Sequence, residues 1–489
     1  MTKKKSVMEP IPTLFDKSRP GRTGGRYPEP SGSAERYLPA SELREDLPLT
    51  ELSEVDVTRH FTLLSQRNYG IDMGLYPLGS CTMKHNPRLN ERIAAMPAFS
   101  ELHPSQPSAT CQGALQIIFE LQNALAEIGG MDAVTLQPAA GAQGEMTGLL
   151  LIRAYHRHRN DPKRTEMLVP DSAHGTNPAT ANLVGLKIVK IPSNSRGRVD
   201  VDAVRAAVGP NTAGMMMTNP NTLGLFEDQI EEIAGIVHSA GGLMYCDGAN
   251  MNAIVGIARP GDMGFDVMHF NLHKTFSTPH GGGGPGCGAV AVKEVLKPFL
   301  PVPYAKETED GTLEWAADLK HSIGRLHGTS GNFAVMLRAY TYIRSLGPDG
   351  LRAVAENAVL NANYIRVGVE KTYPVAYPET CMHEFVASAS ELKKARGIRT
   401  LDIAKRLMDY GYHPPTVYFP LIVPEALMIE PTETETRETL DAFIDALNKI
   451  AEEDPVLVHS APHTMPVTRV DEVEAAKRLD VRWMPPADE

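Results

Sequence analysis

The sequence predicts an α/β protein with a large, mainly parallel sheet and a smaller C-terminal α/β domain. Between residues 106 and 345, short apolar runs typical of buried strands alternate with amphipathic segments of helical period. Polar residues stand at or just after the ends of these apolar runs, which is where parallel sheets bind their ligands. The length of 489 residues allows two or three domains with a large core.

Composition and charge exclude several classes of function. With 48 Lys and Arg against 59 Asp and Glu, the net charge is −11, which argues against nucleic acid or an anionic membrane as main partner. No apolar run approaches the length of a membrane span, and the basic start at residues 1–6 precedes no apolar segment. The five cysteines are widely spaced, which indicates a reducing compartment without a disulfide framework or zinc site. We therefore expect a cytoplasmic protein.

Residues 1–105 are expected to form an N-terminal extended arm and an active-site loop. Residues 1 to about 50 are rich in Pro, Gly, Arg and acidic residues, which predicts an arm that is disordered or lies across a partner subunit. Residues 51–66 show a helical apolar stripe. Residues 67–87 are dense in Gly, Pro and polar residues. That composition favours an ordinary surface loop, although an ordered loop at an active site is the alternative.

The large domain, residues 106–345, is expected to hold the parallel sheet. Its predicted strands lie at residues 134–136, 166–170, 186–190, 213–218, 242–246, 267–270 and 288–292. Its predicted helices lie at residues 112–127, 145–158, 177–184, 201–208 and 226–240.

The small domain, residues 346–489, follows the turn-like residues 347–350. Its expected strands are 383–387, 417–421 and 427–430, and its expected helices are 350–371, 400–410 and a third that Thr432 and Glu433 cap and that ends near 453. The tail after about residue 466 is expected to be a peripheral helix and coil.

Five side chains converge at the predicted strand ends, and this convergence is stronger than any single motif: Gln143, His174, Asn219, Asp247 and Lys274. Residues 138–145 place small residues between a strand and a helix, where free N–H groups at the positive end of the helix suit a phosphate. Such turns are often glycine-rich for packing reasons alone.

Lys274 is the candidate for the chemistry. Most lysines are surface charges, but Leu272 and Phe276 indicate partial burial, which lowers a lysine pKa toward the neutral amine that an imine requires. Asp247 either caps the turn before Gly248 or meets the nitrogen of a pyridine ring and keeps it protonated. His174 is either a turn residue or a ring stacked on a cofactor.

Other motifs give no competing site. His156 and His158 stand two residues apart on a predicted helix and so do not share a face. The chain contains no H-E-x-x-H, no G-x-S-x-G and no phosphate-binding P-loop. The glycine tract 281–286 lets the backbone approach another group closely, but it precedes a strand, and we interpret it as the turn that leads from Lys274 to that strand.

Seven motifs that keep their order over nearly the whole chain resemble those of one enzyme family. They are YPLGSCTMK (76–84), GAQGE (141–145), DSAHGTNP (171–178), MTNPNT (217–222), YCDGANMN (245–252), NLHKTF (271–276) and EPTETE (430–435). The chain resembles the glycine decarboxylase P-proteins of the glycine cleavage system. It is most similar to the separate catalytic chain, subunit 2, found where the P-protein is split in two.

The resemblance implies a fold-type I (aspartate aminotransferase-like) enzyme that depends on pyridoxal 5'-phosphate. Lys274 would hold the cofactor as an imine, Asp247 would pair with the pyridine nitrogen and His174 would stack on the ring. Further residues implied in cofactor binding are Ala142, Gln143, Gly144 and Asn219, with Gly328, Thr329 and Ser330 reaching the phosphate of a neighbouring subunit. For the glycine carboxylate, the nominated residues are Arg67, Arg325 and His383. No metal site is implied.

The resemblance also implies an activity and partners. Glycine would lose CO₂, and the remaining aminomethyl group would pass to the lipoyl arm of the H-protein. Subunit 1 would complete a heterotetramer with two copies of each chain, with no nucleic acid and no membrane involved. Two alternatives stay open. One is another fold-type I enzyme, such as an aminotransferase or a cysteine desulfurase-like protein, and the other is a non-catalytic scaffold subunit without cofactor.

Overall fold

The structure is a computed structural model that describes residues 11–25, 28, 31–43, 49–281 and 286–482. The described residues up to Met73 and from Ser460 onward form one compact unit, and Gly74–His459 form the other. None of the helices in these described ranges is long and apolar enough to cross a membrane. The boundaries expected at residues 105 and 345 stay a prediction.

The smaller unit is built from short helices: α1 (Leu14–Lys17), α2 (Glu54–Ser65) and α16 (Glu472–Lys477). Helix α2 confirms the helix expected within residues 51–66. It begins where the Ser53 side chain accepts a hydrogen bond from Asp56 N and the Asp56 carboxylate accepts one from Ser53 N. The apolar stripe of α2 lies largely exposed at Val55, Phe61 and Leu64.

The larger unit contains a seven-stranded sheet with the strand order β1-β7-β6-β5-β4-β2-β3. The strands are β1 (Ala133–Thr135), β2 (Glu166–Pro170), β3 (Lys187–Ile191), β4 (Thr212–Thr218), β5 (Leu243–Gly248), β6 (Val267–Phe270) and β7 (Val290–Val292). The pairs β3–β2, β2–β4, β4–β5 and β5–β6 are parallel, and β7 runs antiparallel to both neighbours. The predicted mainly parallel sheet is confirmed.

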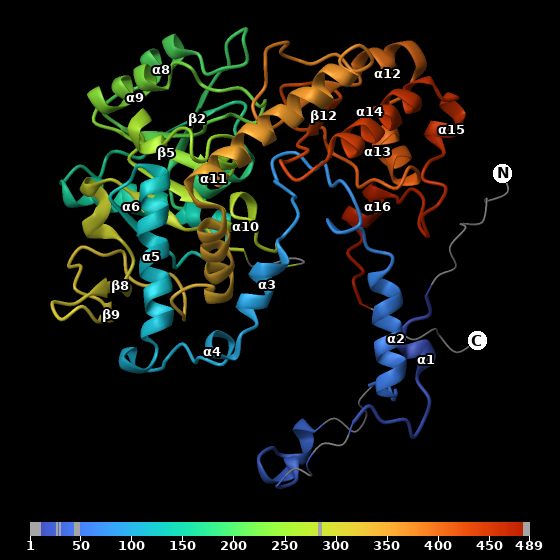
Figure 1. Cartoon of the computed structure of the whole chain (residues 1–489), viewed down its shortest axis with the longest axis horizontal. Coiled ribbons are helices and arrows are strands. Elements are labelled where there is room, and N and C mark those ends of the chain that lie inside the picture. Colours follow the sequence, from blue (N-terminus) through green and yellow to red (C-terminus); the bar gives the residue numbers. More distant parts are fainter. Residues whose placement is uncertain (1–10, 26–27, 29–30, 44–48, 282–285, 483–489) are drawn as a thin grey trace. The chain divides into compact units, whose positions relative to one another are not determined.

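Helices cover both faces of this sheet (Figure 1). In β4, Met215 and Met217 join one apolar core and Met216 joins another, because successive side chains of a strand point to opposite faces. The first core takes its helical residues from α5 (Gln112–Gly129), α8 (Val201–Ala207), α9 (Ile230–Ser239) and α11 (Phe333–Val369). The second takes them from α6 (Gly141–His158) and α7 (Thr176–Leu183).

A second, three-stranded antiparallel sheet has the order β10-β12-β11. It consists of β10 (Phe385–Ser388), β11 (Thr416–Val417) and β12 (Ala426–Ile429). Its core includes buried residues of α13 (Thr400–Asp409) and α14 (Arg437–Glu452). Helix α11 connects the two regions, because Met336 packs in the core of the large sheet whereas Ile365 packs in that of the small one (Figure 1).

Several predicted boundaries were wrong. Helix α6 begins at Gly141, so the small residues expected to precede it form its first turn. Helix α9 begins at Ile230, not at 226. The helix expected at 350–371 is the second part of α11, whose first part ends at Gly347 with a positive φ of 64°. Helix α14 begins at Arg437 after the cap Thr436, because Thr432 adopts a positive φ that a helix excludes.

Other elements had no counterpart in the sequence patterns. They are the hairpin β8 (Tyr304–Glu307) and β9 (Leu313–Ala316), and the short helices α3 (Arg88–Ala94), α4 (Pro97–Ser100), α10 (Leu272–Thr275), α12 (Ser390–Arg396) and α15 (Pro455–His459). Of the glycine tract 281–286, residues 282–285 lie outside the described residues.

Residues 76–84 form an ordered loop, the alternative that composition had not favoured. Two buried carboxyl groups from the small sheet hold it. Ser80 N donates to Glu384 Oε2 over 2.7 Å, and Thr82 donates to Glu430 from N (3.0 Å) and Oγ1 (2.5 Å). Ser80 and Thr82 have positive φ values of 65° and 47°, which non-glycine residues adopt only where their surroundings impose it.

We expect Gly214→Ala to destabilise the protein by about 2 kcal/mol, because a Cβ there would lie 2.1 Å from Leu243 O and push β4 away from β5. Gly235→Ala is the matched control. Its Cβ would meet no atom within 4 Å, and alanine stabilises a helix by up to about 1 kcal/mol relative to glycine. Urea unfolding measures both changes, and a Gly214→Ala midpoint at or above that of the unchanged protein would contradict this packing.

We expect Glu430→Gln to flatten the decline of stability with rising pH. Burial raises the pKa of Glu430 from 4.5 to about 7, so its contribution is complete below pH 4.5 and is lost as the pH rises through 7. The loss amounts to about 3 kcal/mol, which glutamine avoids because it does not ionise. Urea unfolding at pH 5 and pH 8 measures it. The control Glu438→Gln, at an exposed position, should keep the decline, and an equal decline in Glu430→Gln would refute the assignment.

Candidate active site

Lys274 lies in the short helix α10, which follows strand β6 of the large sheet. Strand β6 ends at Phe270, and the short helix that follows carries Lys274 with the buried Leu272 and Phe276 on either side of it. The lysine side chain is half-buried, and its Nζ donates to Ser80 O in the ordered loop over 2.7 Å. The buried neighbours on both sides therefore fix the backbone of Lys274, and its amine contacts the loop of residues 76–84.

A second lysine, Lys84, is buried and has a structural role. Its Nζ reaches Glu433 (2.7 Å), Asn252 (2.8 Å), Thr275 O (2.8 Å) and Tyr342 OH (3.2 Å). Burial alone would lower the pKa of Lys84, but Glu433 and Tyr342 outweigh burial and raise it. All the donors of this ammonium are used. Lys274 donates to a single carbonyl among the described residues, so its amine keeps capacity for a ligand.

Asp247 ends β5 and is buried. Its Oδ2 accepts from Asn177 Nδ2 over 2.8 Å, and its Oδ1 accepts from Ala249 N over 3.0 Å. Burial alone would raise the pKa of Asp247, but His269, Asn177 and Lys274 together hold it below the usual value. The turn interpretation is confirmed, because Asp247 Oδ1 caps the turn at Ala249. The directed role toward a ring nitrogen stays a prediction.

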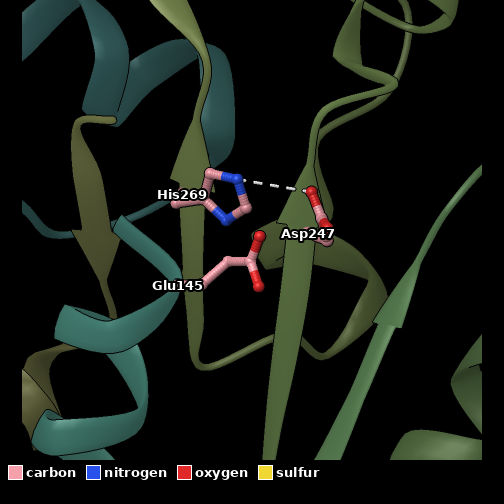
Figure 2. A group of neighbouring side chains, drawn as sticks. All are labelled: Glu145, Asp247 and His269. Atoms are coloured by element: carbon pink, nitrogen blue, oxygen red, sulfur yellow. Dashed lines mark ion pairs between the residues drawn. The ribbon is translucent and has the colours of Figure 1, made fainter. Parts of the chain in front are cut away.

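Asp247, His269 and Glu145 form a buried group, as Figure 2 shows. His269 Nε2 lies 3.3 Å from Asp247 Oδ1, and Glu145 of α6 completes a group whose ligand atoms all lie within 4.8 Å of one another. Burial and the charge of Asp247 raise the pKa of Glu145, whereas the pKa of Asp247 is lowered. These opposite shifts favour the negative charge on Asp247 over Glu145.

His174 follows β2 at the same edge of the sheet. Its Nδ1 lies 2.9 Å from Thr176 Oγ1, and its ring meets that of Phe419 edge-on at 5.4 Å. Burial and then Lys274 lower the pKa of His174, so the imidazole is neutral at pH 7. The effects of Lys274 and Asp247 on its pKa place the ring within electrostatic reach of both groups. A flat, neutral ring in this position can stack on a cofactor.

The start of helix α6 offers a phosphate site. The cap residue Ala140 supplies no side-chain hydrogen bond, so the N–H groups of the first turn have no intrahelical partner. Ala142 is exposed there, whereas the Gln143 amide oxygen accepts from Ala139 N over 2.5 Å. Gly144 is different: its N–H donates to Ala140 O, and a Cβ would lie 2.6 Å from Gly288 O. Its glycine serves packing against the strand β7 region, and its N–H is already used.

The remaining predicted residues stand apart from this group or outside its hydrogen bonds. Asn219 ends β4, but its Oδ1 accepts from Glu227 N over 3.0 Å. Thr329 is exposed beside His327, and Arg325 is exposed and donates to Gly328 O. Arg67 belongs to the smaller compact unit. Their roles in binding cofactor or glycine stay predictions.

His383 is the buried candidate for contact with substrate. Neither ring nitrogen has a hydrogen-bond partner, and Nε2 lies 3.9 Å from both Glu384 Oε1 and Glu430 Oε1. Burial and then Lys274 lower the pKa of His383 to about 3, so it is neutral. Unpartnered buried nitrogens cost about 1–3 kcal/mol each, and a polar ligand beside Lys274 would remove this cost.

Sequence reasoning assigned no role to Glu145, Asn177, His269, Glu384 and Glu430. The signal for His269 was a single polar residue within the apolar strand Val267–Phe270. The two glutamates of the small sheet follow or precede apolar strands in the same way. These are single residues in the printed sequence, and only the sheet register shows which of them meet.

The described residues fit pyridoxal phosphate. An amine with free capacity, an ionised carboxylate and an uncapped helix start lie at one edge of the sheet, and buried polar atoms without partners flank Lys274 along the chain at Asn271 Oδ1, Thr275 Oγ1, Thr278 Oγ1 and His280 Nε2. A Cβ at Gly141 would lie 2.4 Å from Asn271 Oδ1, so the glycine keeps the helix start open beside this segment. A polar ligand would satisfy these atoms.

Comparison with known proteins identifies the family of this chain. Residues 354–465 match the family model described as glycine dehydrogenase, C-terminal domain, and residues 148–337 match that of aminotransferase class-V. A probable glycine dehydrogenase (decarboxylating) subunit 2 from Caldanaerobacter subterraneus subsp. tengcongensis is 57% identical over 477 residues, covering 96% of this chain and 98% of that protein. A protein of the same description from Bacillus velezensis is also 57% identical, with 96% and 97% covered.

The fold is also similar to a solved structure, that of glycine decarboxylase (P-protein) of the glycine cleavage system in inhibitor-bound form. The TM-score is 0.72 at 23% identity, with 85% of this chain and 93% of that chain covered. At this identity the likeness concerns the fold, and it agrees with the predicted fold-type I architecture. The sequence relatives decide the family. This chain belongs to the glycine dehydrogenase (decarboxylating) subunit 2 family.

Proposed function

We propose that this chain is the catalytic subunit of a two-chain P-protein that decarboxylates glycine with pyridoxal phosphate and transfers the aminomethyl group to the lipoyl arm of an H-protein. The observation that supports the proposal is that Lys274, Asp247 and His174 lie at or just after the carboxyl ends of β6, β5 and β2, where Lys274 influences the pKa of the other two. The names of relatives that match almost the whole chain support the choice of glycine as substrate.

Each residue has a distinct task. When bound, pyridoxal phosphate supplies an electron sink for the pair that is left when the bond to the carboxylate breaks. Lys274 would hold the cofactor through its side-chain amine. Asp247, ionised and fixed by Asn177, would keep a proton on the pyridine nitrogen. His174, neutral and hydrogen-bonded through Nδ1, would cover one face of the ring.

The phosphate would lie at the first turn of α6, where the N–H groups of Ala142 and Gln143 donate to it. Gly328, Thr329 and Ser330 lie in an irregular stretch that exposes Gly328 and Thr329, which leaves them accessible to the phosphate of a neighbouring subunit. Asn219 would contribute through the backbone at the end of β4, since its side-chain oxygen is already engaged.

The glycine carboxylate would be received on the side of Lys274 that the ordered loop covers. His383 is buried there with both nitrogens unpartnered, so one of them has a proton to donate. Burial raises the pKa of both Glu384 and Glu430, which favours the neutral, protonated form of these two neighbours. Residues 76–84 exclude water from this side because Glu384 and Glu430 hold them in place.

The assembly follows from the same reading. The word "subunit" in the relatives' description implies a second P-protein chain, subunit 1, and we propose a heterotetramer with two copies of each chain. The lipoylated H-protein is the second partner. We place the enzyme in the cytoplasm, with neither nucleic acid nor membrane as a partner.

We expect Lys274→Ala to abolish the cofactor that borohydride traps on the protein, because reduction fixes only an imine to this amine. Mass spectrometry of the reduced protein measures the trapped cofactor. The matched control is Lys84→Met, which removes the other buried lysine and should keep one trapped cofactor per folded chain. Retained cofactor in Lys274→Ala, or its loss in Lys84→Met alone, would refute the assignment.

We expect the unchanged chain, with subunit 1 and H-protein present, to exchange labelled CO₂ into the carboxyl group of glycine. Asp247→Asn should lower the exchange by about 100-fold or more, because the amide no longer holds a charge against the ring nitrogen. The control Asp266→Asn changes a carboxylate near the opposite end of β6 that pairs with His238, and it should leave the exchange unchanged. No exchange by the unchanged protein would refute the glycine reading.

A further inference from the structure

The hydrogen bonds around Asp247 extend further than its contact with Asn177. On one side, His269 Nε2 lies 3.3 Å from Asp247 Oδ1, and His269 Nδ1 lies 2.8 Å from Tyr245 OH. On the other side, Asn177 Nδ2 donates to both Asp247 Oδ2 (2.8 Å) and Glu145 Oε2 (3.3 Å). Every one of these side chains is buried.

The sheet register makes the contact between His269 and Asp247 obligatory. The two residues are partners in the parallel pairing of β5 and β6, so both side chains leave the sheet on the same face. Tyr245 stands two positions before Asp247 on β5 and therefore also shares that face. Tyr245, Asp247 and His269 therefore lie on one face of two neighbouring strands. Glu145 of α6 lies beside Asp247 and His269 on that face (Figure 2).

The contacts of Tyr245 bear on the tautomer of His269. Tyr245 has one hydroxyl proton and two acceptors within range, His269 Nδ1 at 2.8 Å and Gly144 O at 3.4 Å. When Tyr245 donates over the shorter contact, Nδ1 accepts and Nε2 carries the hydrogen that faces Asp247. Asp247 accepts from Ala249 and Asn177 and lies 3.3 Å from His269 Nε2, surroundings that favour its ionised form.

Glu145 connects this group to His174. Thr176 Oγ1 lies 2.8 Å from Glu145 Oε1 and 2.9 Å from His174 Nδ1. Thr176 Oγ1 donates to Glu145 Oε1, so one hydroxyl group connects Glu145 with His174. Glu145 Oε2 meanwhile accepts from Asn177 and Thr180. Glu145 therefore joins the contacts of His174 to those of Asn177, which also donates to Asp247.

We propose that His269 and Glu145 are positioning residues for the cofactor ring: His269 holds Asp247 ionised, and Glu145 connects Asp247 with His174 through Asn177 and Thr176. This inference rests on the proposed function, since it assumes that Asp247 faces the ring nitrogen. The charged and titratable groups around Asp247 are Tyr245 on its own strand, His269 on β6, Glu145 on α6, Lys274 on α10 and His174 after β2. The two positioning residues act through Asp247 and His174.

The test is the protonation of the ring nitrogen, measured without turnover. The enzyme, assembled with subunit 1, is loaded with cofactor labelled with ¹⁵N in the ring, and the ¹⁵N resonance is followed against pH. We expect His269→Gln to lower the apparent pKa of the ring nitrogen by about one unit, the effect of one hydrogen bond to a charged group. Tyr245→Phe, which keeps the packing, should shift it in the same direction by less.

Glu145→Gln should shift the titration by less than His269→Gln, because Asp247 keeps its donors Asn177 and Ala249. His238→Gln is the matched control. It removes a histidine that pairs with Asp266 over 2.7 Å at the opposite end of the sheet, and the titration should not change. If His269→Gln fails to fold, Tyr245→Phe decides the matter alone.

Each other outcome overturns the inference. An unchanged titration in both His269→Gln and Tyr245→Phe means that Asp247 does not depend on His269. A shift in Glu145→Gln as large as that expected for His269→Gln means that Glu145 carries the charge. One equivalent of a tightly bound divalent metal in the purified enzyme would mean that Glu145, Asp247 and His269 are ligands, since their atoms lie close enough to share an ion. No protein-bound resonance in the unchanged enzyme would refute the proposed function as well, which separates the two failures.

Discussion

The register between β5 and β6 is the constraint on which the rest of the site depends. It sets Asp247 opposite His269 and Gly248 opposite Phe270, where β6 ends and the chain turns toward Lys274. A shift of one residue would send Asp247 to the opposite face, into the core that Cys246 and Met268 now fill. Gly248 keeps the strands close there, because a Cβ would lie 2.0 Å from His269 O. The relative position of amine and carboxylate is therefore a property of the sheet.

The small sheet completes the site from the other side. Glu384 precedes β10 and Glu430 follows β12, and the antiparallel pairing of these strands brings both carboxyl groups to one end. They hold residues 76–84, whose carbonyl at Ser80 is the acceptor for Lys274. Ser80 and Thr82 adopt positive φ, and the glutamates that bind their N–H groups help to hold this shape. The loop thus connects the glutamates of the small sheet with Lys274 through hydrogen bonds.

The sequence predicted much of this fold, for reasons that particular elements make clear. Strands β2, β4 and β5 are continuous apolar runs that end at polar residues, and this pattern predicted both the parallel sheet and its functional edge. The start of α6 was placed four residues too late, because small residues between a strand and a helix look like a turn in sequence. The hairpin β8–β9 was missed because its two strands are only four residues long and mix apolar with charged residues.

The site was predictable only in part, for a different reason. Asp247 lies near the end of β5, and His174 and Lys274 follow β2 and β6 by four residues, so the pattern nominates them and the family resemblance gives them their expected roles. Glu145 and His269 are single polar residues in a helix and a strand, and what they do depends on which residues lie opposite them. Lys84 likewise shows that the role of a polar residue depends on its partners in the fold. It is as buried as any catalytic lysine, yet Glu433, 349 positions later in the sequence, gives it a structural role.

The distribution of charge around Lys274 follows from these contacts. Four buried carboxyl groups influence one another or the lysine, and burial opposes the ionisation of all four. Asp247 alone has donors enough to overcome it, whereas Glu145, Glu384 and Glu430 have raised pKa values. A site with four ionised carboxylates would repel the carboxylate of an incoming amino acid. With the negative charge concentrated on Asp247, the edge of the sheet stabilises one protonated ring nitrogen and leaves the loop side open to an anionic substrate.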